Sequence, residues 1–326
     1  MVRDRVIFDI IVIGAGPSGI ALGHILKEKN LNYLILEKGR VANSFFNMPD
    51  KLSLITLWRS NYLREADREL FDLNSTQTAK EYGGYLVKIA QDLEIEESCE
   101  VFGIAKEDIY TLKTSSGDYQ TKIVVDASGY FSSPYIPKFQ KNDVTAKIYH
   151  FNDFKNADMI HSDDRILIVG SRLSAGQLIG ELSSRCKNIS LSLRSEVKYS
   201  SKVGVRNFFL RNIKLFDFLI SLFGRRKKLE VPMDYEYKQI VSTLSHYPKI
   251  ASITHKSVTF EDSRVAEFDY IFFATGYENV GQFTKHYSTK NFYSIGRECL
   301  YSFKSRFLRG IREDVFRLWK EIEVNI

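Results

Sequence analysis

The sequence predicts an α/β fold made of two parallel-sheet domains, the second inserted into the first. One reason is that an apolar strand, a glycine turn and a helix follow one another twice, first near the N-terminus and again after residue 163. Another is that two further apolar strands, each ending in Ala-Ser/Thr-Gly-Tyr, flank the second of these units. The 326 residues, 44% of them hydrophobic, are enough for one large domain or two ordinary ones.

The first unit begins with an apolar, β-branched run at 6–13 and continues into the glycine turn "GAGPSG". Gly14 permits a tight turn, Gly16 leaves room for a pyrophosphate, and Gly19 allows the next helix to pack closely on the strand. A second strand ends at Glu37, 18 residues after Gly19, where a carboxylate accepts hydrogen bonds from ribose hydroxyls. Strand, turn, helix and acid occur in the required order, so this unit predicts a Rossmann-like dinucleotide site.

The second unit, at 164–182, repeats the strand, turn and helix but departs from the glycine pattern. Gly170 takes the first glycine position, whereas Arg172 stands at the second. The Arg172 side chain must therefore point away from a bound dinucleotide or meet its phosphates directly. The next strand ends at Arg194, and an arginine there favours the 2′-phosphate of NADPH over the hydroxyl of NADH. The alternative is a degenerate unit kept for packing alone.

The segments 122–137 and 268–280 are the two strands that flank the second unit, and they predict the domain order. We interpret both as crossovers between the dinucleotide-binding domains. The first domain is then discontinuous and comprises 1–136 and 258–326, and the second domain, 137–257, is inserted between its two parts.

Composition excludes several functions. The chain has 46 basic and 40 acidic residues, and its net charge of +6 is too dispersed for a nucleic-acid-binding surface. Cys99, Cys186 and Cys299 form no CxxC pair and no metal-ligand spacing, which indicates a reducing, cytoplasmic location and no bound metal. The first nine residues lack the features of a signal peptide, and no apolar run is long enough to span a membrane.

With these motifs in this order, the chain resembles the class B flavin monooxygenase group, which includes flavin-containing and Baeyer–Villiger monooxygenases and short flavoprotein relatives. The resemblance covers nearly the whole chain: "GAGPSG", "DASGY", "YIPKF", a GxxxSA turn and "ATGY" occur in that order. It implies FAD in the first domain and NADPH in the second. The segment 291–297 resembles the strand and turn that close over the flavin, although Arg297 replaces the usual acidic residue. The start of the last helix then faces the flavin ring.

The resemblance implies which residues of this sequence bind each cofactor. For FAD they are Gly14, Gly16, Pro17, Ser18, Gly19, Glu37, Lys38, Ser44, Phe45, Trp58, Asp126, Ala127, Gly129, Gly296 and Arg297. For NADPH they are Gly170, Ser171, Arg172, Ser174, Ala175, Arg194, Ser195, Thr275 and Gly276. The segment 44–58 resembles the loop that crosses near the flavin ring, which makes Thr56 a candidate catalytic residue.

A second candidate catalytic residue is His150. The stretch 144–154 carries half of the FxGxxxHxxx signature that these monooxygenases show between their domains. His150 and the closing Phe154 match, whereas Val144 and Ala146 replace the Phe and the Gly. His150 is therefore a linker-orienting or cofactor-proximal candidate, and the alternative is an ordinary packing histidine.

The implied activity is that of an oxidoreductase in which NADPH delivers hydride to FAD and the protein excludes water from the ring. In a monooxygenase a C4a-(hydro)peroxyflavin then oxygenates a small organic substrate with O2, and the sequence leaves the substrate open. One alternative is an NADPH-dependent disulfide reductase without CxxC. The bacillithiol-type relatives, which are also similar, carry a cysteine just before the third glycine, where this chain has Ser18. Another alternative is a non-catalytic flavin-binding sensor or accessory protein.

The segment 207–228 lies outside the shared pattern. Its polar positions recur every three or four residues, which predicts a helix with a broad apolar face that ends at Gly224 and precedes a basic cluster. One interpretation is that this helix packs on the NADPH domain or covers the substrate site. The other is peripheral contact with an anionic membrane surface, a lipid-like substrate or a partner.

Overall fold

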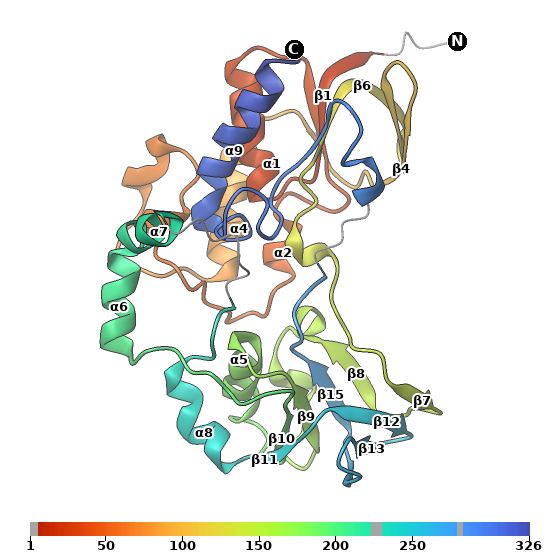
Figure 1. The fold of residues 1–326 in the computed structure, drawn as a ribbon, viewed down its shortest axis with the longest axis vertical. Helices are drawn as coiled ribbons and strands as arrows, with labels where there is room; N and C mark the ends of the chain where they lie inside the picture. Colours follow the sequence, from red (N-terminus) through yellow and green to blue (C-terminus); the bar gives the residue numbers. More distant parts are fainter. Residues whose placement is uncertain (1–5, 223–229, 279–282) are drawn as a thin grey trace.

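The computed structural model describes residues 6–222, 230–278 and 283–326, and Figure 1 shows them as two α/β units joined by extended segments. The first unit contains both ends of the chain, and the second contains residues from the middle of the sequence. The helices α6 and α7 lie along one side of the molecule and run between the two units.

Among the described residues, the first unit contains a seven-stranded sheet covered by helices. Parallel strands run in the order β3-β2-β1-β6, β16 pairs with the end of β6, and the antiparallel β5 and β4 complete the other edge. The strands are β1 (Ile7–Ile13), β2 (Tyr33–Leu36), β3 (Ile95–Glu96), β4 (Val101–Lys106), β5 (Tyr110–Thr114), β6 (Gly117–Asp126) and β16 (Phe292–Ser294). The helices are α1 (Pro17–Glu28), α2 (Asn43–Phe46), α3 (Trp58–Asn61), α4 (Ala79–Ala90) and α9 (Leu308–Glu323).

The core of this unit forms because its central strand and its helices present apolar faces to one another. Ile10, Ile11 and Val12 of β1 are fully enclosed, as a parallel strand covered on both faces requires. α9 buries an apolar stripe whose members are three or four residues apart. The stripe consists of Ile311, Val315, Leu318 and Ile322. α4 begins with a capping box between Thr78 and Glu81, which fixes its first turn.

Within the described ranges, the second unit contains two sheets. In the larger one the order is β11-β10-β9-β15-β8, and all pairs are parallel; in the smaller one the order is β14-β13-β12-β7. The strands are β7 (Gln140–Asn142), β8 (Lys147–His150), β9 (Ile166–Val169), β10 (Ile189–Ser192), β11 (Ser245–Tyr247), β12 (Ile250–Thr254), β13 (Ser257–Phe260), β14 (Val265–Glu267) and β15 (Tyr270–Phe273). The helices of this unit are α5 (Leu173–Leu182) and α8 (Lys238–Thr243), and the helices between the two units are α6 (Val203–Arg211) and α7 (Ile213–Leu222).

The predicted boundary at 257/258 is wrong, because it falls inside β13. The strands β13 and β14 pair within the smaller sheet of the second unit, and β15 lies between β9 and β8 in the larger one. The chain therefore returns to the first unit only after Phe273. The physical reason is that the apolar residues of β15 are buried on both faces, so this strand completes the second core before the crossover begins.

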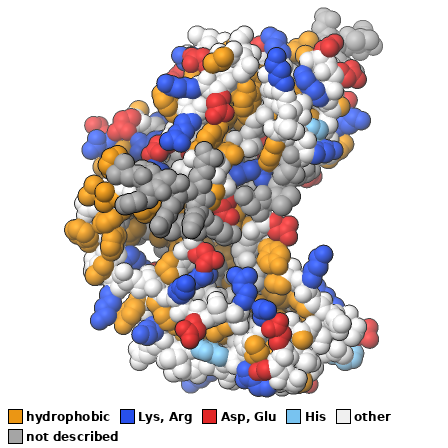
Figure 2. Space-filling view, viewed as in Figure 1, with side chains coloured by type: hydrophobic (Ala, Val, Ile, Leu, Met, Phe, Trp, Pro, Cys, Tyr) orange, Lys and Arg blue, Asp and Glu red, His pale blue; other side chains and the backbone are white. Residues whose placement is uncertain are grey.

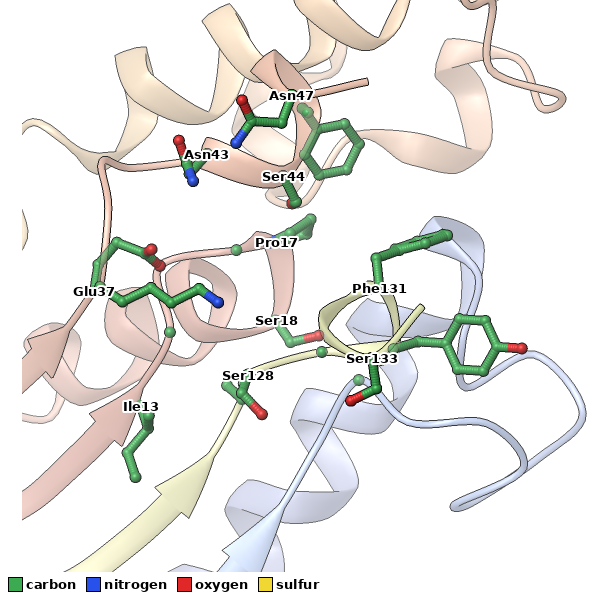
Figure 3. A pocket seen from close by; sticks show the side chains of 18 of the residues that line it. Ile13, Pro17, Ser18, Glu37, Asn43, Ser44, Asn47, Ser128, Phe131 and Ser133 are labelled. Carbon is green, nitrogen blue, oxygen red and sulfur yellow. The ribbon is translucent and has the colours of Figure 1, made fainter. Parts of the chain in front are cut away.

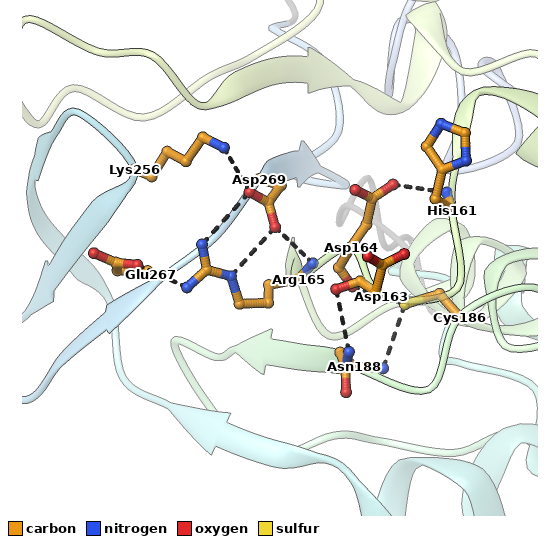
Figure 4. A network of polar contacts seen from close by, with 9 residues as sticks. All are labelled: His161, Asp163, Asp164, Arg165, Cys186, Asn188, Lys256, Glu267 and Asp269. Atoms are coloured by element: carbon orange, nitrogen blue, oxygen red, sulfur yellow. Dashed lines mark hydrogen bonds and ion pairs between the residues drawn. The ribbon is translucent and has the colours of Figure 1, made fainter.

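A network of charged side chains fixes the start of β15 against the start of β9 (Figure 4). Arg165 donates to Asp269 Oδ2 from its backbone N–H at 2.9 Å and from Nε at 3.2 Å, and Lys256 Nζ donates to Oδ1 at 2.8 Å. The hydrogen bonds from Arg165, and then Lys256, hold the pKa of the Asp269 carboxyl far below its usual range. The network lies at the amino ends of these parallel strands, away from the edge where α/β sheets bind ligands, so we assign it to stability.

The two crossovers run side by side and pair with one another. Pro134 and Tyr277 form an antiparallel bridge, the Tyr135 N–H donates to the Gly276 carbonyl at 3.0 Å, and the Glu278 N–H donates to the Ser133 carbonyl at 2.9 Å. The two units are therefore connected through a short two-stranded link, which fixes how the carboxyl edges of their sheets approach each other.

The helix expected over 207–224 is broken in the structure. α6 and α7 meet at Asn212, whose Nδ2 donates to the Phe208 carbonyl at 2.9 Å and so competes with the backbone bonds of a continuous helix. The expected helix end at Gly224 and the basic cluster lie outside the described residues. No helix that the structure describes is both long and apolar enough to cross a bilayer.

Candidate functional site

A cavity of 540 Å³ opens at the carboxyl ends of β1, β2 and β6, which is the edge where doubly wound sheets bind ligands. Figure 3 shows side chains of the first glycine turn, the end of β2, α2 and the segment after β6 around one space. The start of α9 closes the opposite side, with Arg306, Leu308 and Ile311 among the lining residues. One cavity thus connects segments that are far apart in the sequence.

The three glycines of the first turn differ in what they permit. Gly14 has a φ of +107°, and a Cβ there would lie 2.7 Å from the Ala127 carbonyl oxygen. A Cβ at Gly19 would lie 2.0 Å from the Gly14 carbonyl oxygen, so both positions exclude a side chain. Gly16 is different, since its φ is −84° and no atom of the described residues lies within 4 Å of an added Cβ. The space above Gly16 belongs to the cavity, at the N-terminus of α1, where no side chain caps the helix.

Glu37 is the acidic residue at the end of β2, and its carboxylate is buried and fixed. Oε2 accepts the Ala15 N–H at 2.8 Å and Oε1 accepts the Gly39 N–H at 2.9 Å. Each oxygen keeps a further lone pair that can accept from a ligand hydroxyl. Because Glu37 also lines the cavity, it presents a pre-oriented acceptor next to the glycine turn.

The opposite end of the cavity is aromatic and cationic. Arg306 forms an ion pair with Glu298 at 2.7 Å, and its guanidinium carbon lies 5.5 Å from the Tyr130 ring centroid. Leu308 and Ile311 of the first α9 turn lie beside it. Glu298 compensates the Arg306 charge, and the start of the last helix adds the positive end of its dipole at this end of the cavity.

Most of the residues predicted for FAD line this cavity. They are Gly14, Gly16, Pro17, Ser18, Glu37, Lys38, Ser44, Phe45, Ala127, Gly129 and Gly296. Four of the predicted residues do not: Gly19, Trp58, Asp126 and Arg297. Gly19 acts through the close contact of helix and strand described above.

Asp126 and Arg297, both predicted to bind FAD, do not line the cavity but form a buried pair beneath it. Arg297 Nη2 donates to Asp126 Oδ2 at 2.7 Å, and the Tyr287 hydroxyl donates to the same oxygen at 2.8 Å. The reason is that β16 pairs with β6, which places residue 297 next to the end of β6. The arginine side chain therefore turns toward the carboxylate below instead of toward a ligand.

Thr56 and Trp58 also lie away from the cavity. The Thr56 hydroxyl donates to Asn61 Oδ1 at 2.7 Å, so it is occupied within its own loop. The Trp58 ring stacks on Phe71 with centroids 3.7 Å apart and, together with Tyr85, lines a separate hollow beside α4. The structure therefore gives Thr56 no route to a ligand in the main cavity and gives Trp58 a packing role.

His150 is buried at the end of β8, with both ring nitrogens engaged. Nδ1 accepts the Asn152 N–H at 3.1 Å, which leaves the proton on Nε2 to donate to the Gly276 carbonyl at 2.9 Å. Burial lowers the pKa of His150 below its usual value and so favours the neutral ring. His150 therefore orients the crossover through Gly276 and also orients Asn152, which lines the cavity. Because both ring nitrogens are engaged, neither is available for proton transfer to a ligand.

The second glycine turn repeats the steric plan of the first. Gly170 has a φ of +146°, and a Cβ there would lie 2.6 Å from the Ala274 carbonyl oxygen, just as Gly14 approaches Ala127. In both turns, therefore, the first glycine packs closely against the backbone of the alanine that begins a crossover. None of the residues predicted for NADPH lines the main cavity, because this turn belongs to the other unit.

Arg172 and Arg194 have different surroundings. The Arg172 guanidinium forms an ion pair with Glu230, and its backbone bridges with Pro232, so the side chain points toward the segment that crosses the start of α5. In the first unit Ile13 pairs with Leu36, and Glu37 follows Leu36. In the second unit Val169 pairs with Ser192 in the same way, so the residue equivalent to Glu37 is Leu193. The exposed Arg194 lies one residue further along the chain. The prediction for Arg194 is corrected by that one position.

Sequence reasoning missed several residues that line the cavity. They are Asn43, Asn47, Cys99, Val101, Ser128, Phe131, Ser133, Asn152, Phe283, Ser305, Arg306, Leu308 and Ile311. Asn43 and Ser128 are adjacent in sequence to predicted residues, so they could have been predicted from that position. Cys99 and Val101 carried no such signal, because their position depends on how β4 joins the sheet edge.

The fold and the two matched glycine turns define a two-unit dinucleotide-binding oxidoreductase. Residues 11–294 match the family described as pyridine nucleotide-disulphide oxidoreductase, and the chain belongs to that family. The relative named "Uncharacterized oxidoreductase CzcO" from Bacillus velezensis is 30% identical over 289 residues, 83% of this chain and 82% of its own.

Two solved structures share the fold. The flavin-containing monooxygenase from Stenotrophomonas maltophilia superposes with a TM-score of 0.74 at 16% identity, covering 98% of each chain. The bacillithiol disulfide reductase Bdr from Bacillus cereus gives 0.73 at 17% identity, covering 98% of this chain and 100% of its own. The family match and these neighbours confirm the resemblance and the α/β fold class inferred from the sequence.

Proposed function

We propose that the protein is a monooxygenase that uses FAD and NADPH to insert one atom of O2 into a small organic substrate. The observation that carries this proposal is the single cavity that joins the first glycine turn, Glu37 and the start of α9. These parts suit an extended dinucleotide, because Glu37 would meet its ribose, the glycine turn its pyrophosphate, and the start of α9 its ring.

The residues present fit FAD. Glu37 offers fixed acceptors for ribose hydroxyls, and the open space above Gly16 suits a pyrophosphate at the N-terminus of α1. At the far end, Phe131 and Arg306 would border the ring, and the positive end of the α9 dipole would favour negative charge on it. Bound FAD would supply the hydride acceptor and the oxygen chemistry, which side chains do not provide.

NADPH fits the second turn through Gly170, the N-terminus of α5 and the exposed Arg194. The overall reaction balances: NADPH supplies a hydride with two electrons, a proton comes from solvent, one oxygen atom enters the substrate and the other leaves as water. The chain's own task is to hold the two dinucleotides at facing sheet edges, which the paired crossovers and His150 support.

A disulfide reductase is the second candidate, and the shared fold with Bdr favours it. The residue at the start of α1 argues against it, since Ser18 lines the cavity and lies against Gly296 where the reductase relatives have a cysteine. The cavity does contain Cys99, but this residue lies at the ribose end: its N–H donates to the Glu37 carbonyl at 2.9 Å. A thiol at that end has no direct route to electrons from the ring.

The test is to mix purified protein with NADPH without oxygen and then to admit O2 with amines, sulfides or ketones as substrates. We expect NADPH to bleach the flavin, and oxygen uptake to match NADPH use with an oxygenated product. Turnover that requires a low-molecular-weight disulfide, independent of O2, would establish the reductase instead. A bound flavin that NADPH does not reduce would exclude both enzymes and indicate a non-catalytic flavin-binding sensor or accessory protein.

A further inference from the structure

The helices α6 and α7 carry an apolar surface that faces solvent, and we call residues 202–222 the α6–α7 surface. Figure 2 shows orange side chains gathered over these helices at one edge of the molecule. Between 41% and 59% of each of the following residues is exposed. They are Val205, Phe208, Phe209, Leu215, Phe218 and Leu219. This result contradicts the interpretation that the segment is buried against the NADPH domain.

The surface is anchored to the body of the protein at defined points. Asp217 is buried and forms an ion pair with Arg309 of α9 at 3.0 Å, and Arg59 Nη1 donates to the Arg211 carbonyl at 3.0 Å. Phe209 and Phe216 pack with ring centroids 4.4 Å apart and join the two helices. The apolar side chains are therefore presented outward by helices whose polar contacts point inward.

We propose that the α6–α7 surface docks the protein on an anionic lipid membrane. The segment 202–222 has four basic residues, Lys202, Arg206, Arg211 and Lys214, against one acidic residue, and that one, Asp217, is buried in its ion pair. Arg206 is compensated by an ion pair with Asp234 at 2.8 Å, whereas Lys202, Arg211 and Lys214 are exposed beside the apolar side chains. Apolar groups next to unopposed positive charge complement the acyl chains and headgroups of an anionic bilayer.

The charge pattern also decides between a membrane and a second copy of this chain. A two-fold dimer would place the same surface against itself and so bring like charges together. An anionic bilayer instead neutralises these positive charges, and the binding free energy becomes more favourable with each basic residue near the membrane surface. Helices of 9 and 10 residues are too short to span, so they lie in the plane of the interface. This inference is independent of the proposed reaction.

The test is co-sedimentation of the full-length protein with phosphatidylcholine vesicles made with or without phosphatidylglycerol. We expect binding to the anionic vesicles that weakens with added salt, and little binding to the neutral ones. The double variant Leu215→Glu/Leu219→Glu should lower the partition coefficient by about tenfold or more. The matched control Phe102→Glu/Val265→Glu changes two residues that are each 61% exposed elsewhere and should bind like the wild type.

Several outcomes would overturn the proposal. They are no binding to anionic vesicles, equal loss in the control variant, or a wild-type dimer that the Leu215→Glu/Leu219→Glu variant converts to a monomer without any lipid binding. Far-UV circular dichroism checks the fold of each variant. If the double variant does not fold, Lys214→Glu provides the second measurement: weaker binding to anionic vesicles supports docking, and unchanged binding contradicts it.

Discussion

The Arg297 guanidinium donates to the Asp126 carboxylate at 2.7 Å beneath the cavity, with only 6% and 0% of the two side chains exposed. The same guanidinium lies 5.1 Å from the Tyr287 ring centroid, and Tyr287 also donates to Asp126. An arginine at a position where the resembling family has an acid is thus compatible with the fold, because its charge is neutralised below the site. The pair supports the cavity from underneath without facing a ligand.

Removing one member of this pair should cost stability. Arg297→Met leaves the Asp126 carboxylate buried with only neutral donors, and we expect a loss of about 3–5 kcal/mol in the free energy of unfolding. The double variant Arg297→Met/Asp126→Asn removes both charges and should recover most of that loss. Urea denaturation measures both. A single variant as stable as the wild type would show that the pair contributes nothing.

Gly14 and Gly16 should respond differently to the same substitution. Gly16→Ala meets no atom of the described residues within 4 Å and has an ordinary φ, so we expect an unchanged Tm of the FAD-free protein but a large loss of FAD. Gly14→Ala meets a carbonyl oxygen at 2.7 Å with φ +107° and should unfold more easily. Gly84→Ala is the matched control, since its Cβ also meets no atom within 4 Å in the described part of the chain, and it should keep both Tm and FAD. Full FAD retention by Gly16→Ala would place the pyrophosphate elsewhere.

Glu230 should limit the affinity for NADPH. Its carboxylate neutralises Arg172 at the start of α5, so Glu230→Gln frees the guanidinium to meet phosphate oxygens. We expect the KM for NADPH to fall severalfold with little change in kcat, as measured by steady-state kinetics. A rise in KM would indicate instead that the ion pair keeps Arg172 out of the way of the dinucleotide.

Asp314 should make stability depend on pH. Burial raises the pKa of this α9 carboxyl to about 6, although the Ser305 hydrogen bond opposes that effect. A raised pKa means that the folded state prefers the proton, so the free energy of unfolding falls as the pH rises from about 4 to about 6. Asp314→Asn should remove this fall and add about 3 kcal/mol of stability at neutral pH. Parallel slopes of stability against pH in variant and wild type would exclude this role.

The glycine turns and crossovers were predictable because each depends on local backbone geometry that a short motif encodes. Gly14 and Gly170 are examples, since both carry a positive φ and meet a crossover alanine. The same holds for Glu37, whose place at the end of a strand follows from spacing. The domain boundary failed because no local signal in β13–β15 says which sheet those strands join.

Side-chain direction was the other feature that the sequence did not determine. Arg297 and Trp58 occupy the expected chain positions, yet their partners Asp126 and Phe71 are distant in sequence or in another element and turn them away from the cavity. The break at Asn212 was likewise missed, because the periodicity continues through it, whereas the non-helical backbone of Asn212 and its side-chain bond to Phe208 appear only in the structure.

The most direct measurement is the FAD content of the gently purified protein together with its reduction by NADPH without oxygen. We expect a yellow protein with about one FAD per chain, bleached by NADPH, and a colourless but folded Gly16→Ala variant. A folded wild-type protein that is colourless and does not take up added FAD would contradict a flavin site in the first unit.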